Sequence, residues 1–205
     1  GSAGKTTTTT LVGRMAKAAV ETSAGSGEYR KEWVGGNIGS PLVAFVDEMQ
    51  KQDLAIMELS SFQLEIMTRS PHVAAVLNVT PNHLDRHVTM EAYLAAKARI
   101  LAFQSTQDGV VLGRDEPNSW GLSSVAQGQV LSFGFQPLAP GESGVFLQKD
   151  DIYLRIAGDD DLLLMSTRDI SLRGDHNILN VMAACTIAAA AQLPASAMRA
   201  GELPP

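Results

Sequence analysis

The sequence predicts an α/β fold in three layers, with a mostly parallel sheet flanked by helices and a smaller antiparallel β appendage. Three observations lead to this prediction. The chain opens with a glycine-rich turn that ends in Gly-Lys-Thr and runs into a helical pattern. Short apolar runs then alternate with helical periodicity, which is typical of parallel strands joined by helices. Over about 129–172 the pattern changes to closely spaced strand-like runs, which predict the appendage.

The elements of the first half follow from the spacing of apolar residues. Helical spacing continues through the β-branched run Thr6–Thr10, and Ser40-Pro41 forms a cap and first-turn pair for a second helix. Nearly continuous apolar runs suit central strands of a parallel sheet. The expected order is a helix over 5–20, an irregular stretch over 22–36, a helix from Ser40, strands over 54–59 and 73–79, a helix within 89–103 and a strand over 110–112.

The second half predicts the appendage and a closing helix. Lys149-Asp150-Asp151 has the composition of a hairpin connection between two strand-like runs. The expected order is strands over 130–133, 145–148, 152–156 and 162–165, a helix over 176–192, and the start of a linker over 194–205. The length suits one principal domain, which we expect over 1–193.

Composition narrows the classes of function. With 45% hydrophobic and 19% charged residues, the 205-residue chain is globular and neither disordered nor a coiled coil. Its net charge of -6 and only 16 basic residues leave no broad basic surface for nucleic acid. The longest apolar stretch, 181–193, is too short to cross a bilayer, and the lone Cys185 cannot form an internal disulfide. We therefore expect a cytoplasmic protein without nucleic-acid or membrane partners.

The glycine-rich turn is the sharpest local signal. Backbone N–H groups and the helix N-terminus at 1–6 can surround phosphate oxygens, while Lys5 supplies charge and Thr6 a hydroxyl for magnesium. This predicts a nucleoside triphosphate held as in the three-layer fold of P-loop NTPases, and the alternative is a tight turn before an ordinary helix. Such a turn usually joins a buried strand to a helix, and no strand precedes Gly1, so we expect the sequence to be part of a longer chain.

Lys97 occupies an unusual place in its predicted helix. On a helical wheel Tyr93, Leu94, Ile100 and Leu101 lie on the same side, which puts this lysine in the middle of an apolar face. Burial lowers the pKa of an amine, and a neutral amine can be covalently modified. The alternative is that the side chain extends along the apolar surface to solvent.

Further polar residues follow the predicted strands or open the last helix. Glu58 ends one strand and His83 follows another, so both should reach the sheet edge where the turn lies and could join Thr6 around divalent cations. Loop hydrogen bonding is the alternative for each. Asn177 and Asn180 are spaced i, i+3 and can present amides to a purine base, although helix capping explains Asn177 nearly as well.

Taken together, the motifs resemble the ATP-dependent Mur ligases of peptidoglycan precursor synthesis. The resemblance depends on Gly1-Ser2-Ala3-Gly4-Lys5-Thr6-Thr7, Gly35-Gly36-Asn37-Ile38-Gly39, Asn78-Val79-Thr80-Pro81-Asn82-His83-Leu84-Asp85, Ala95-Ala96-Lys97-Ala98-Arg99-Ile100 and Gly174-Asp175-His176-Asn177-Ile178-Leu179-Asn180. The stretch 58–65, Glu-Leu-Ser-Ser-Phe-Gln-Leu-Glu, resembles the branch that adds D-glutamate to UDP-N-acetylmuramoyl-L-alanine. Another amino acid, or a folylpolyglutamate-like substrate, is the alternative within the family.

The resemblance implies roles for individual residues. The phosphates of ATP would lie on Gly1, Ser2, Ala3, Gly4, Lys5, Thr6 and Thr7; one Mg²⁺ on Thr6 and Glu58; a second Mg²⁺ on His83 and a carbamylated Lys97; the acyl substrate on Asn37 and Ser60; and the adenine side on Asn177 and Asn180. The sequence departs from many relatives at Asn82, where they have Asp, and at Ser2-Ala3, where they have Thr-Asn.

The reaction that the resemblance implies makes an amide through an acyl phosphate, with Lys5, His83 and Lys97 as the catalytic set. The chain would be the central ATP-binding domain of a monomeric enzyme. An N-terminal UDP-sugar-binding domain and a C-terminal domain would lie outside the sequence, so the fragment alone should not catalyse ligation. A P-loop kinase for a small molecule, or a nucleotide-binding module without turnover, are the rival interpretations.

Overall fold

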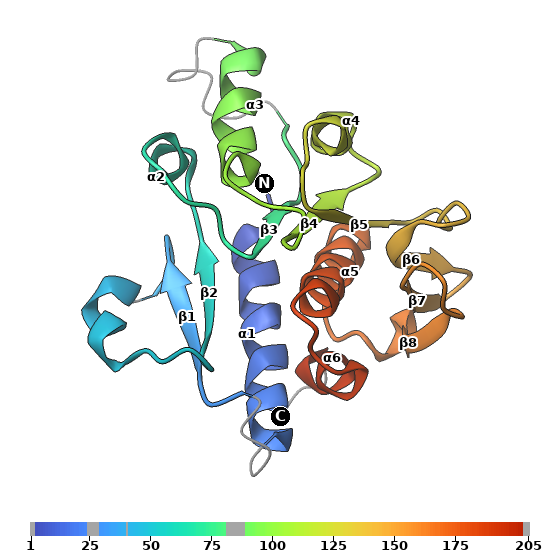
Figure 1. The fold of residues 1–205 in the computed structure, drawn as a ribbon. Coiled ribbons are helices and arrows are strands. Elements are labelled where there is room, and N and C mark those ends of the chain that lie inside the picture. Colours follow the sequence, from blue (N-terminus) through green and yellow to red (C-terminus); the bar gives the residue numbers. More distant parts are fainter. Residues whose placement is uncertain (1–2, 24–28, 40, 81–88, 203–205) are drawn as a thin grey trace.

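A computed structural model describes residues 3–23, 29–39, 41–80 and 89–202 of the chain (Figure 1). Its elements, in order, are α1 (Lys5–Thr22), β1 (Glu32–Gly36), η1 (Leu42–Glu48), β2 (Leu54–Glu58), α2 (Ser61–Glu65), β3 (Val73–Val76), α3 (Met90–Ala98), η2 (Arg99–Leu101), β4 (Gly109–Gly113), α4 (Pro117–Gly121), η3 (Leu122–Ser124), β5 (Gln129–Gly134), β6 (Ser143–Gln148), β7 (Asp151–Arg155), β8 (Leu162–Ser166), η4 (Thr167–Asp169), α5 (Asp175–Ala190) and α6 (Ala195–Glu202). None of the helices in the described part of the chain has the length and hydropathy needed to span a membrane.

The strands form two sheets. One holds β1 and β2, which run parallel, and the other holds six strands in the order β3-β4-β5-β6-β7-β8. Neighbours from β3 to β6 are parallel, and only the β6–β7 and β7–β8 pairs are antiparallel. The predicted α/β class with a mostly parallel sheet is confirmed. The antiparallel part is smaller than predicted, because β5 is parallel to both of its neighbours and β6 is antiparallel only to β7.

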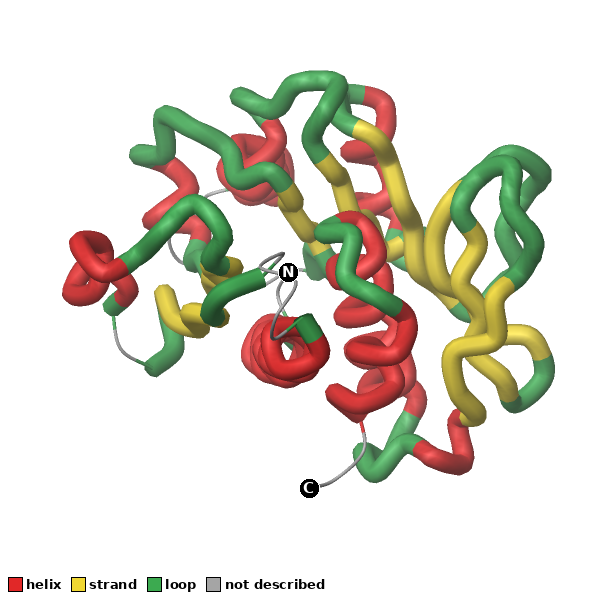
Figure 2. Tube along the Cα trace, turned by 60° about the horizontal axis from the view of Figure 1, so that its bottom comes forward, coloured by secondary structure: helices red, strands yellow, loops and turns green. Residues whose placement is uncertain are grey.

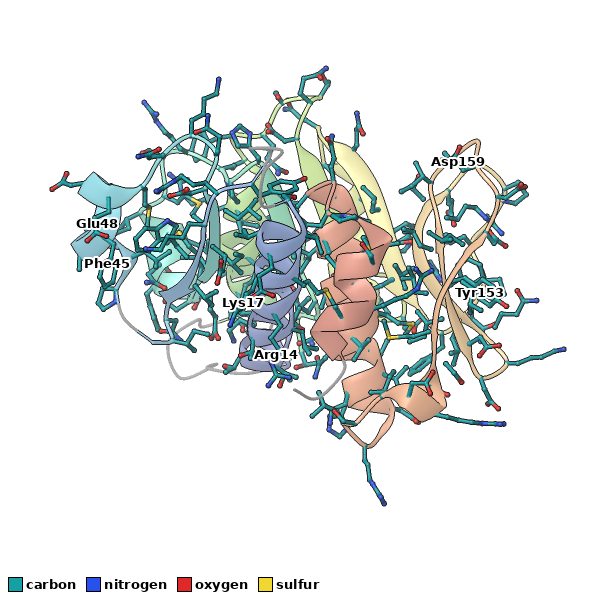
Figure 3. The ribbon with its side chains drawn as sticks, turned by 90° about the horizontal axis from the view of Figure 1, so that it is seen from below. Arg14, Lys17, Phe45, Glu48, Tyr153 and Asp159 are labelled. Carbon is teal, nitrogen blue, oxygen red and sulfur yellow. The ribbon has the colours of Figure 1, made fainter. Side chains whose placement is uncertain are left out.

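Helices cover both faces of the six-stranded sheet, as the three-layer prediction requires. On one face α1, α5 and α6 pack with Val111, Phe133 and Val145 in the larger core. On the other face α3, η2 and η3 pack with Val110 and Leu112 in a second core. Figure 2 shows the strands of the large sheet beside α5, with α1 between this sheet and the small one. Seen from below, α1 carries the exposed Arg14 and Lys17 on its outer side (Figure 3).

Two segments differ from the sequence prediction near β1. The stretch predicted to be irregular contains β1, whose Gly35 and Gly36 hide the strand pattern. The helix predicted after Ser40 is the 3₁₀ helix η1; Ser40 itself lies outside the described residues, and within η1 only Leu42 is buried. Val46 is 57% exposed, so the helix has no continuous apolar face. The exposure of Val46 follows because η1 packs on β1 through Phe45, whose ring stacks on that of Trp33 with 5.5 Å between the ring centroids.

The segment predicted to begin a linker forms α6 instead. Its Ala197 and Met198 are buried in the larger core. A methyl group on Gly201 would lie only 2.5 Å from Cγ of Met15, so this glycine allows α6 to pack directly on α1. Small or apolar residues recur every few positions in this segment and form the buried face of α6. The prolines on either side of the segment obscured this pattern in the sequence.

The beginnings of β1 and β2 are tied together by one carboxylate. Asp53 accepts hydrogen bonds from Nε and Nη2 of Arg30 at 2.6 and 2.5 Å and from Nε1 of Trp33 at 2.7 Å. The backbone N–H of Gln50 donates a further bond at 3.1 Å. The hydrogen bonds from Arg30 in particular hold the pKa of Asp53 well below its usual range. The ionised carboxylate therefore stabilises the small sheet.

We predict that Asp53→Asn lowers the free energy of unfolding at neutral pH. A depressed pKa in the folded state means that the stabilisation by Asp53 is present above the ordinary carboxyl pKa of 3.8 and is lost as the pH falls through the folded value. The difference between wild type and variant, measured by urea unfolding, should shrink on acidification below about pH 4. Asp47→Asn, at an exposed carboxylate of η1, serves as the matched control. An Asp53→Asn difference that stays constant with pH would contradict this assignment.

Candidate functional site

The glycine-rich turn leads into the start of α1. The N-cap, Gly4, has φ of 79° in the left-handed region, and the first turn of the helix carries neither a capping side chain nor an acidic residue. The amide groups and dipole at the start of α1 therefore favour an anionic ligand. Lys5 and Thr7 lie in the first turn and are half-buried, while Gly1 and Ser2 lie outside the described residues.

Asn78 holds the turn from the side of the large sheet. It follows β3, and its Oδ1 accepts a hydrogen bond from the backbone N–H of Ala3 at 3.0 Å. Its Nδ2 donates to the carbonyl oxygen of Ala3, also at 3.0 Å. Sequence reasoning missed this residue as part of the site, although an asparagine directly after a buried apolar run was an available signal. Asn78 thus fixes both backbone polar groups of one residue of the turn.

Asn180 holds the turn from the side of α5. A methyl group on Gly4 would lie 2.1 Å from Oδ1 of Asn180, so only glycine allows this approach. The Nδ2 group of Asn180 donates to Oδ1 of Asn177 at 3.2 Å, and Nδ2 of Asn177 donates to the carbonyl oxygen of Arg173 at 2.9 Å. The structure therefore places the two asparagines beside the glycine-rich turn and connects them to each other.

Glu58 lies at the end of β2 with 4% of its surface exposed. Its Oε2 accepts a hydrogen bond from Oγ1 of Thr6 at 2.9 Å, and its Oε1 contacts Nδ2 of Asn37 at 3.4 Å. The two segments also contact each other through their backbones, because the N–H of Asn37 donates a hydrogen bond to the carbonyl oxygen of Glu58 at 2.7 Å. Gly36, with φ of 105°, makes room, since a methyl group there would lie 2.3 Å from that same oxygen. The structure thus brings Thr6, Glu58 and Asn37 together.

Ser60 has a local role in the structure. It is the N-cap of α2, where its hydroxyl oxygen accepts a bond from the backbone N–H of Gln63 while the Gln63 side chain accepts from the N–H of Ser60. This capping box is by itself a sufficient structural reason for a serine at this position. Its hydroxyl lies only two residues beyond Glu58, so it remains near the site along the chain.

Lys97 is buried, as its place on the helical wheel predicted. Only 4% of its surface is exposed, and its Nζ lies 5.2 Å from the ring centroid of Tyr93. Burial, and secondly the positive charge of Lys5, lowers the pKa of Lys97 to about 8. Lys5, Glu58 and Lys97 all line one cavity of about 820 Å³, so the two lysines belong to one site.

The donor set suits magnesium. Glu58 offers a carboxylate and Thr6 a hydroxyl, which are the hard oxygen ligands that Mg²⁺ takes alongside water and substrate phosphates. Within the described residues no group of three or more His, Cys, Asp or Glu side chains could hold a metal ion. A site with few protein ligands is the arrangement that Mg²⁺ uses with nucleotides. His83, the other predicted ligand, lies outside the described residues.

Comparisons with known proteins agree with this geometry. The family model described as the Mur ligase middle domain matches residues 1–188. A UDP-N-acetylmuramoylalanine--D-glutamate ligase from Symbiobacterium thermophilum is 41% identical over 97% of this chain and 42% of its own length. A ligase of the same name from Acetivibrio thermocellus is 41% identical over 90% of this chain and 37% of its own length. The chain therefore spans less than half the length of these relatives.

Solved structures support the fold. The UDP-N-acetylmuramoylalanyl-D-glutamyl-2,6-diaminopimelate--D-alanyl-D-alanyl ligase from Acinetobacter baumannii superposes with a TM-score of 0.65 at 19% identity, over 98% of this chain and 44% of that one. A pseudomurein peptide ligase type C from Methanothermus fervidus gives 0.64 at 12% identity, over 97% of this chain and 47% of that one. At these identities the likeness concerns the fold alone. The family match over residues 1–188 and the identity to curated relatives show that this chain belongs to the Mur ligase family, as its middle domain.

Proposed function

We propose that this chain is the ATP-binding central domain of a ligase that joins D-glutamate to UDP-N-acetylmuramoyl-L-alanine. The observation that carries the proposal is the contact between Thr6 and Glu58 beside the uncapped start of α1, which sets a magnesium ligand pair next to a phosphate-binding turn. The choice of substrates is supported by the names of relatives that are 41% identical to the chain. Domains for the UDP-sugar and the amino acid would lie in the rest of the longer protein.

Different residues of the site would bind different parts of ATP and of the acyl substrate. The amide groups at the start of α1 and the ammonium of Lys5 would hold the β- and γ-phosphates. Thr6 and Glu58 would hold Mg²⁺, which supplies positive charge to neutralise the transferring phosphoryl group. Asn177 and Asn180 would face the adenine side, and Asn37 with Ser60 the acyl substrate. Asn78 keeps the turn in place by holding Ala3.

The reaction then needs no protein nucleophile. A carboxylate oxygen of the acyl substrate attacks the γ-phosphorus, the bond to the β,γ-bridging oxygen breaks, and ADP leaves. The amine of D-glutamate attacks the carbonyl carbon of the acyl phosphate, phosphate leaves with the electron pair of the C–O bond, and the amine proton passes to solvent or a base. The contribution of the chain is to position the phosphates and to stabilise charge that develops on them.

Lys97 fits a role as a carbamate in this site. Its lowered pKa makes about half of the amine neutral at pH 8, and that amine can add to CO₂ with loss of one proton. The product carries a negative charge in place of a positive one. This change would convert the repulsion between Lys97 and Lys5 into attraction and would supply an oxygen ligand for a second Mg²⁺ with His83.

The first test concerns the phosphate site. We predict that Lys5→Ala weakens ATP binding to the full-length enzyme about 10- to 100-fold, because a charge-assisted bond to phosphate is lost. Isothermal titration calorimetry with Mg²⁺ present measures this change. Lys17→Ala, on the exposed side of the same helix, should leave the affinity unchanged. Equal affinities for wild type and Lys5→Ala would refute the phosphate assignment. In a separate product assay of the full-length enzyme, a phosphorylated product without a new amide would favour the rival interpretation as a P-loop kinase.

The second test concerns Lys97. At pH 8 about half of a lysine with pKa about 8 is neutral, compared with about 0.3% for one at the ordinary value of 10.5. We therefore expect a carbamate signal in carbon-13 NMR under labelled bicarbonate at pH 8. The signal should disappear in Lys97→Met and persist in Lys17→Met. If the spectra of all three proteins are the same, Lys97 is not carbamylated.

The third test concerns the position of the turn. Asn78→Leu keeps the shape of the side chain but removes both bonds to Ala3, so we predict about tenfold weaker ATP binding with unchanged adenosine binding. Fluorescence titration of each ligand measures the two affinities. Gln129→Leu, at an exposed amide at the opposite end of the strands, where β5 begins, is the matched control. A parallel loss of adenosine affinity would mean that Asn78 supports the fold and not the turn.

A further inference from the structure

Asn78 lies beyond the part of β3 that the sheet holds. The pairing of β3 with β4 ends at Val76, whose partner is Leu112, so Asn78 follows the last pair by two residues. Its side chain nevertheless holds both backbone polar groups of Ala3, at 3.0 Å each. Such a contact is stable only where the backbone that carries the side chain is itself fixed, because ordering a mobile backbone costs conformational entropy. The segment after β3 therefore needs a support other than the ladder of the sheet.

The first turn of α4 supplies this support. The N–H of Val79 donates a hydrogen bond to Oε2 of Glu116 at 2.8 Å, and the carbonyl oxygen of Val79 accepts one from Nδ2 of Asn118 at 3.0 Å. Val79 is completely buried, so both bonds form in an environment of low dielectric constant, which strengthens them. The N–H that Glu116 binds belongs to the peptide group between Asn78 and Val79. The orientation of this peptide group is thereby fixed.

Two further contacts bring the start of α4 and the end of β4 close to this segment. The hydroxyl of Ser119, which is completely buried, donates to the carbonyl oxygen of Val76 at 2.6 Å. Gly113 ends β4, and a methyl group there would lie 2.2 Å from the carbonyl oxygen of Leu77, so only glycine allows this approach. The backbone is thus held on both sides of Asn78.

The residue type at position 116 is a second, independent observation. Glu116 is the N-cap of α4, and its carboxylate also accepts hydrogen bonds from the N–H groups of Asn118 and Ser119 at 3.1 and 2.8 Å. Serine, threonine, aspartate and asparagine are the preferred residues at an N-cap, so capping alone gives no reason for the longer glutamate. The longer side chain lets one carboxylate bind the start of α4 and Val79 together.

We propose that Glu116 and Asn118 are positioning residues for the phosphate-binding turn and that they act through Asn78. The contacts lead from the start of α4 to Val79, and from the neighbouring Asn78 to Ala3, so neither positioning residue touches a nucleotide. The inference rests on the proposed function, because it is a phosphate ligand that requires the turn to be held in one place. Loss of the contact between Glu116 and Val79 should leave α4 folded but allow Asn78 and Ala3 to move.

Glu116→Asp separates the two roles of this carboxylate. Aspartate is a preferred N-cap and keeps α4 capped, but it is one methylene shorter and does not reach Val79. In the nucleotide-free full-length enzyme we expect the amide of Ala3 to exchange with solvent about fivefold faster than in wild type, while the amides of α4 keep their rates. Hydrogen exchange detected by NMR measures both.

Glu142→Asp is the matched control for this experiment. Glu142 also accepts a hydrogen bond from a backbone N–H, that of Ala139 at 2.9 Å, but in the turn before β6. Its replacement should leave the exchange of Ala3 unchanged. An unchanged rate at Ala3 in Glu116→Asp, or equal acceleration at Ala3 and throughout α4, would overturn the proposal.

A double-mutant cycle on ligand affinity tests whether the effect passes through Asn78. Glu116→Asp and Asn118→Leu should each weaken ATP binding about fivefold and leave adenosine binding unchanged. In the Asn78→Leu background neither replacement should weaken ATP binding further, because the link to the turn is already broken. Effects that multiply would mean that the two residues support the fold in general, and would overturn the proposal. A wild-type enzyme that does not bind ATP would instead refute the proposed function, and the exchange of Ala3 would still decide whether Glu116 positions the turn.

Discussion

The glycine-rich turn is the point on which the rest of the site depends, because three distant segments meet there, two of them through hydrogen bonds. Asn78 after β3 holds Ala3, Asn180 of α5 packs on Gly4, and Glu58 of β2 contacts Thr6. A side chain at Gly4 would separate α5 from the turn. The turn therefore fixes the relative positions of both sheets and α5, and the same contacts set the start of α1 in place for a phosphate.

The electrostatics of the cavity favour an anionic ligand there. Lys5 and Lys97 share it, and the positive charge of Lys5 disfavours the charged form of Lys97. Glu58 contributes negative charge at the same end of β2. A bound triphosphate or a carbamate on Lys97 would offset the excess of positive charge, so the unusual lysine and the phosphate-binding turn have a common physical basis.

The comparison of prediction with structure separates two kinds of information. Elements with a long regular pattern, such as α1 and α5, were predicted to within two residues, and the burial of Lys97 followed from helical spacing alone. Short elements were missed when their pattern was interrupted. The glycines of β1 interrupted its strand pattern, and the prolines that flank α6 made its segment resemble a linker. The Asn78 contact was missed because its partner, Ala3, is 75 residues away in the chain.

The sequence by itself determined the local features of this protein: the glycine-rich turn, the order of most helices and strands, the apolar face that contains Lys97, and the family motifs. These depend on residues within one or two turns of each other, where spacing alone decides which side chains lie together. Only the tertiary structure decided the parallel pairing of β5 and β6, the packing of α6 on α1, and the pairing of β2 with β1 and of β3 with β4. Strand partners and buried faces depend on contacts between distant segments, and the free energy of those contacts is not encoded in any short stretch of sequence.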